Sequence, residues 1–194
     1  MRLWKHPISS CFSFMIYKNP LLYHNHISQA LKFAQIAHAN FDDVHEVYYL
    51  NSFEIIRTVT NDSDIISAFV LKDTTHIMSE EFLSIFFNKN IGNLVYKFNF
   101  GYFHDLEYAL EQDWRIILFH IVDRLFYLQY LHFMQKYDKL VARETINFHL
   151  CLASYFHFSV IKNNLGDISY EILYPRLYHK TKIDMQTYIM DSIC

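Results

Sequence analysis

Two aspartate and histidine pairs are the side chains of this sequence best suited to chemistry. His76 follows Asp73 by three residues and His120 precedes Asp123 by three, a spacing that places each pair on one helix face. Imidazole and carboxylate groups together bind divalent metals, and such an ion lowers the pKa of a bound water so that hydroxide is available at neutral pH. Because the chain has 12 histidines, a purely structural, hydrogen-bonded role is the competing interpretation.

Composition restricts the other possibilities. The cysteines at 11, 151 and 194 are odd in number and widely spaced, which favours a reducing cytoplasm over a disulfide scaffold. The net charge of −3 comes without a run of Lys and Arg, so nucleic acid is not expected as a partner. No uncharged run approaches the roughly 18–20 residues that a bilayer requires, so no membrane segment is expected.

The elements that would position these residues are helices. Three glycines and three prolines in 194 residues are too few for the turns of a β-sandwich or barrel. We therefore predict an all-α, single-domain fold, with residues 1–25 as an N-terminal extension and residues 26–194 as the domain. Apolar spacing predicts helices over residues 27–39, 48–59, 65–71, 114–137, 143–160 and 163–173, another that begins at Ser79 to Glu81, and a last one after Lys180.

Four stretches of the sequence together resemble a single family. The most specific begins with Ala142-Arg143-Glu144-Thr145 and continues through Leu152-Ala153, Ile161-Lys162, Leu165, Asp167, Tyr174-Pro175 and Tyr178. The others are residues 30–38, residues 65–73 and residues 113–125, the last with Asp123-Arg124-Leu125. In this order and spacing they resemble the helical HD domain of the RelA/SpoT family, over about residues 30–180.

The resemblance implies a specific activity and a specific metal site. Members of the family hydrolyse the 3′-pyrophosphate of the stringent-response alarmones, guanosine tetra- and pentaphosphate ((p)ppGpp). They use a manganese ion held by two histidines and two aspartates. In this sequence the two aspartates correspond to Asp73 and Asp123, whereas Asn51 and Lys72 stand where the histidines belong.

Other parts of the family's site are also replaced. Thr74-Thr75-His76 stands near the place of a glutamate and aspartate pair that assists the attacking water, and about three residues appear deleted there. Asp42 and Asp43 replace a basic pair that grips the nucleotide, and two carboxylates repel a polyphosphate. Tyr127 replaces an asparagine that follows the aspartate, arginine and leucine motif.

We therefore expect a cytoplasmic pseudoenzyme of the alarmone hydrolases that binds a nucleotide or a protein and holds no cofactor. Without a metal, the Lys72 ammonium is expected to contact Asp73 or Asp123, whose carboxylates should share a pocket. One alternative is an active phosphohydrolase on (p)ppGpp or a related nucleotide, with Mn²⁺ held in a rearranged site by His76 or His120. Another is a protein-interaction module with an exposed aromatic patch.

Overall fold

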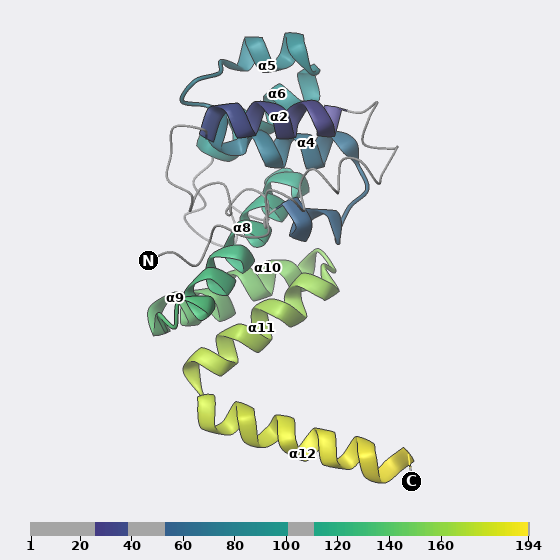
Figure 1. Cartoon of the computed structure of the whole chain (residues 1–194), viewed down its shortest axis with the longest axis vertical. Helices are drawn as coiled ribbons and strands as arrows, with labels where there is room; N and C mark the ends of the chain where they lie inside the picture. Colours follow the sequence, from purple (N-terminus) through teal and green to yellow (C-terminus); the bar gives the residue numbers. More distant parts are fainter. Residues whose placement is uncertain (1–25, 39–52, 101–110, 194) are drawn as a thin grey trace. The chain divides into compact units, whose positions relative to one another are not determined.

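The computed structural model describes residues 26–38, 53–100 and 111–193 of the chain (Figure 1). Within these ranges the chain is helical and holds no β-strand, which confirms the all-α prediction. The chain divides into an N-terminal unit, Met1–Phe103, and a C-terminal unit, His104–Cys194. No helix of the described ranges is long and apolar enough to cross a membrane.

Helix α4, Ser63–Leu71, is the centre of the N-terminal unit. It begins two residues before the predicted Ile65, because the Asp62 side chain accepts hydrogen bonds from the main-chain N–H groups of Asp64 (2.9 Å) and Ile65 (3.2 Å). Every residue from Ile65 to Leu71 is buried, and α4 packs against α2, His26–His38, and against α6, Lys89–Phe100. α2 confirms the helix predicted over residues 27–39 to within one residue at each end.

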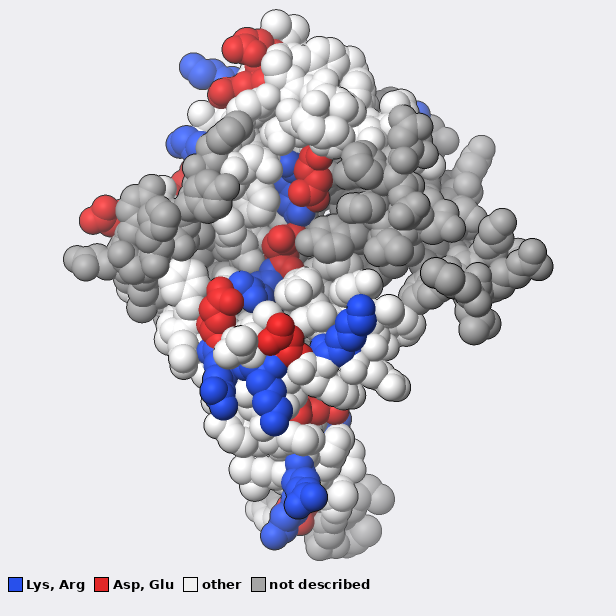
Figure 2. Space-filling view, turned by 90° about the vertical axis from the view of Figure 1, so that its left-hand side faces the viewer, with Lys and Arg blue, Asp and Glu red and all other residues white. Residues whose placement is uncertain are grey.

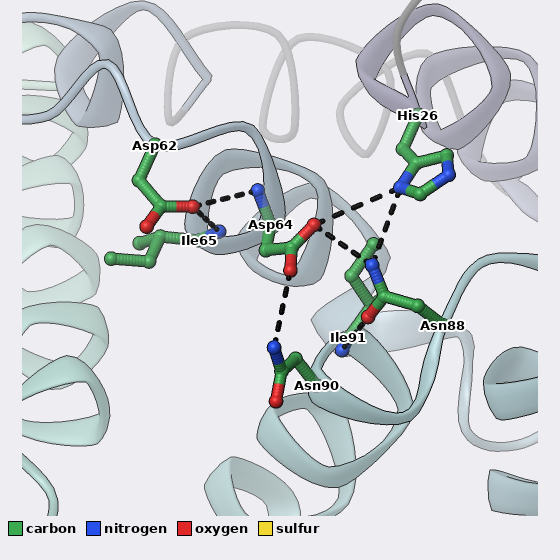
Figure 3. Close-up of polar contacts among 7 residues, drawn as sticks. All are labelled: His26, Asp62, Asp64, Ile65, Asn88, Asn90 and Ile91. Atoms are coloured by element: carbon green, nitrogen blue, oxygen red, sulfur yellow. Dashed lines mark hydrogen bonds and ion pairs between the residues drawn. The ribbon is translucent and has the colours of Figure 1, made fainter.

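A polar network ties the starts of α4 and α6 together (Figure 3). The Asn88 amide donates to Asp64 Oδ1 at 2.9 Å, while its own carbonyl oxygen accepts from the Ile91 N–H at 2.9 Å and so caps α6. Asn90 donates to the other Asp64 oxygen at 3.4 Å, and His26 Nδ1 lies 3.7 Å from Oδ1. One aspartate in the first turn of α4 therefore fixes the start of a helix 24 residues later in the chain.

Helices α5 and α6 pack closely against each other. α5, Glu80–Phe86, begins at the predicted N-cap, where Ser79 Oγ accepts from the Phe82 N–H at 3.2 Å. The sequence analysis did not anticipate α6. A methyl group on Gly92 of α6 would stand 2.2 Å from Ser84 Oγ and 3.0 Å from the main chain of α5, so only glycine permits this approach.

The C-terminal unit is built on α8, Trp114–Phe133, whose N-cap is Asp113. Ten of its residues are buried, as expected of the longest apolar run. α8 ends four residues before the predicted Tyr137, because Gln135 takes a left-handed conformation (φ 54°) and the Lys136 N–H turns back to the Leu131 carbonyl at 2.9 Å.

The prediction of one continuous helix over residues 143–160 was wrong. The chain forms α9, Lys139–Glu144, then a π-helical turn, Thr145–His149, then α10, Leu150–Tyr155. His157, at φ 59°, then breaks the run before α11, Ser159–Leu173. α8, α9 and α10 all pack against α11.

The last helix, α12, is Pro175–Ile193. Pro175 was expected to halt the preceding helix, and α11 does end at Leu173. The same proline then opens α12, since the first turn of a helix needs no N–H from that residue. The helix predicted after Lys180 therefore begins earlier than expected, at Pro175. Of the helix predicted over residues 48–59, residues 53–57 are helical and residues 48–52 lie outside the described ranges.

Candidate functional site

The side chains of Lys72 and Asp73 form an ion pair at the C-terminal end of α4. Lys72 Nζ donates to Asp73 Oδ2 at 2.6 Å, which confirms the contact expected between the ammonium and one of the two aspartates. The lysine side chain is only 3% exposed, whereas the aspartate is 40% exposed. The carboxylate therefore keeps solvent on one side and balances the charge of a buried ammonium on the other.

The surroundings of Lys72 explain how an ammonium can be buried. The chain leaves α4 through a 3-10 turn, Lys72–Thr74, which directs the lysine inward. Its Nζ lies 5.6 Å from the ring centroid of Phe69 and 5.6 Å from that of Phe98, distances typical of cation–π contacts. The Asn99 amide donates to the main-chain oxygens of Lys72 and Val95, and so joins the turn to α6.

This arrangement has a clear consequence for metal chemistry. A protonated lysine has no lone pair to offer a cation, and it carries positive charge at the position where the family resemblance predicts a metal ligand. Asp73 Oδ2 accepts from that ammonium. The pair is complete without an ion.

His76 contacts the main chain beside Asp73. Its Nδ1 lies 2.8 Å from the Asp73 carbonyl oxygen, a distance at which a protonated Nδ1 donates to the carbonyl. The ring is exposed. Within the N-terminal unit, His76 therefore closes the turn after α4, which is the structural interpretation of the Asp73 and His76 spacing.

Asp123 and Arg124 lie side by side on α8 in the C-terminal unit. Arg124 Nη2 donates to Glu144 Oε1 of α9 at 2.8 Å, so the arginine joins the two helices. Asp123 is partly buried, and Tyr127, one turn later, is 39% exposed. The predicted common pocket of Asp73 and Asp123 would join two separate units and stays a prediction.

His149 is a buried polar residue that the sequence analysis missed. It ends the π-helical turn and its side chain is buried. Burial first, and then the nearby Arg124 guanidinium and His120 ring, lower the pKa of His149 from 6.5 to about 3. The position of His149 in the sequence could have indicated its burial. It lies at helical spacing from Thr145, Leu152 and Ala153, which are also buried, in a run that is otherwise mostly apolar.

The remaining predicted site residues lie elsewhere. Asn51, Asp42 and Asp43 fall outside the described ranges. Among the residues that the structure does describe, no three His, Cys, Asp or Glu side chains gather closely enough to hold a metal ion together. On the face drawn in Figure 2, acidic and basic side chains are interspersed, a surface pattern that does not resemble a phosphate-binding stripe.

Comparisons with known proteins add no assignment. No protein-family model matches the chain, and no curated protein matches it. The interpretation of the site therefore rests on its residues.

Proposed function

We propose that this chain is a non-catalytic relative of the HD-type (p)ppGpp hydrolases, which acts in the cytoplasm by binding a nucleotide or a partner protein. The observation that carries the proposal is the ion pair between the buried Lys72 and the partly exposed Asp73. In the resemblance, these two positions belong to the histidine and aspartate that give the HD class its name. Here they neutralise one another.

Both members of the pair, the Lys72 ammonium and the Asp73 carboxylate, oppose metal binding. A divalent cation at Asp73 would have to share the carboxylate with an ammonium 2.6 Å from Oδ2, and the buried Lys72 would then lie beside a second positive charge. Asn51, in place of the other histidine, offers an amide oxygen, which is a weaker ligand for manganese than imidazole. These losses support binding without metal-assisted hydrolysis.

The charge of the expected nucleotide site supports the same conclusion. Asp42 and Asp43 stand where the family has a basic pair, and they would repel a ligand that carries four or more negative charges. A nucleotide with fewer phosphates, or a protein surface, meets less repulsion. The proposed ligand class is therefore a regulatory nucleotide poorer in charge than the alarmones, or a protein.

The experiment is an assay of the purified chain with guanosine tetraphosphate and Mn²⁺. We expect pyrophosphate release at the rate of the protein-free control. We also expect less than about 0.1 manganese per chain after growth in manganese and removal of loosely bound ions. Stoichiometric manganese together with hydrolysis would overturn the proposal. It would favour the rearranged site at His76 or His120, which replacement of each by alanine would then locate.

A second candidate function, a protein-interaction module, is favoured by an aromatic patch on the N-terminal unit. Phe82 and Phe86 of α5 stack at 5.8 Å, both are exposed, and Phe33 of α2 meets Phe86 at 4.7 Å. Beside them Ile85 is 87% exposed. Exposed apolar groups gathered in this way mark interaction sites more often than scattered ones do.

A photo-crosslinking amino acid placed at position 85 tests this second function. The matched control places it at position 97, where an exposed lysine lies in α6 of the same unit. A discrete crosslinked protein captured from position 85 and absent from position 97 would support the module. Equal capture from both positions would count against it.

A further inference from the structure

We draw no further inference here: the strongest candidate, the groove that Tyr170, Tyr174, Leu177 and Met185 line along α11 and α12 in the C-terminal unit, is an unpartnered apolar face, and nothing in the part of the chain that the structure describes shows what covers it.

Discussion

Lys72 and Asp73, adjacent in sequence, form a 2.6 Å ion pair in which the cation is buried and the anion is half in solvent. Removal of the lysine and removal of the aspartate should therefore lower the free energy of unfolding by different amounts. Asp73→Ala leaves a buried ammonium without its carboxylate, and we expect it to lower the free energy of unfolding by about 2–3 kcal/mol. Lys72→Met fills the same space with an apolar chain and leaves a hydrated carboxylate, so we expect a change within about 1 kcal/mol.

Urea unfolding of the two variants measures this asymmetry. The double variant Lys72→Met with Asp73→Ala serves as the control, and it should resemble Lys72→Met alone because the ammonium is gone in both. Equal losses from the two single variants would show that the ammonium does not depend on Asp73.

Restoring the two family histidines should not restore hydrolysis. Asn51→His with Lys72→His might be thought to rebuild the ion site, but the carboxylate pair that assists the attacking water is still missing and Asp42 and Asp43 still repel the phosphates. Residues that act as a unit do not contribute additively, so repair of one part recovers little. We expect no pyrophosphate release above that of the same double variant carrying Asp123→Ala. Manganese-dependent release that Asp123→Ala abolishes would contradict this prediction.

His149 should make the fold sensitive to acid. Its pKa is lowered to about 3 in the folded chain, so between pH 6.5 and about 3 the unfolded chain binds a proton that the folded chain does not. The contribution of His149 to the free energy of unfolding is therefore fully present above pH 6.5. It is lost as the pH falls from 6.5 to about 3, by at most ~1.4 kcal/mol per pH unit.

Replacement of His149 by glutamine removes this titration while it keeps a polar side chain. We expect the free energy of unfolding of His149→Gln to fall less between neutral pH and about pH 4 than that of wild type. His76→Gln is the control at an exposed histidine and should retain the wild-type slope. Parallel pH profiles for wild type and His149→Gln would show that His149 does not stay neutral in the folded chain.

The two helical glycines should respond to alanine in opposite directions. In Gly92→Ala the new methyl group meets Ser84 Oγ at 2.2 Å and α5 main-chain atoms at 3.0 Å, so α5 and α6 must move apart, at a cost of about 1–3 kcal/mol. In Gly166→Ala the nearest atom is Leu150 Cδ1 at 3.8 Å, an ordinary contact, so the better helix former should stabilise by about 0.5–1 kcal/mol. Urea unfolding of both variants measures the difference, and a Gly92→Ala variant as stable as wild type would contradict the close approach of α5 and α6.

The caps of helices were the most predictable part of this fold. Ser79 acts within three residues of itself, so local sequence was sufficient to place the start of α5, and Asp62 caps α4 in the same local way two residues before the predicted start. The breaks at Gln135 and His157 were not predictable, because both residues adopt a left-handed conformation that their types do not require. α6 was missed although Ile91, Leu94, Val95 and Phe98 have helical spacing, because asparagine and glycine between them weaken the propensity signal.

The residues of the candidate site also include one feature that the sequence predicted and one that it did not. The contact of Lys72 with Asp73 followed from the expected loss of the metal, because carboxylates at an empty ion site require another positive charge. The burial of His149 did not, since it depends on a π-helical turn that turns the ring inward and on the approach of α8.

The close approach at Gly92 also sets the order in which part of the chain can form. α5 has seven residues and buries a single one, Leu83, so it is too short to be helical in isolation. Its helical state therefore depends on an α6 that is already in place. In native-state hydrogen exchange the amides of α5 should open as one group and well before those of α4, whose residues from Ile65 to Leu71 are all buried. Phe82 and Phe86 would then move as part of a small cooperative folding element, separate from the rest of the N-terminal unit.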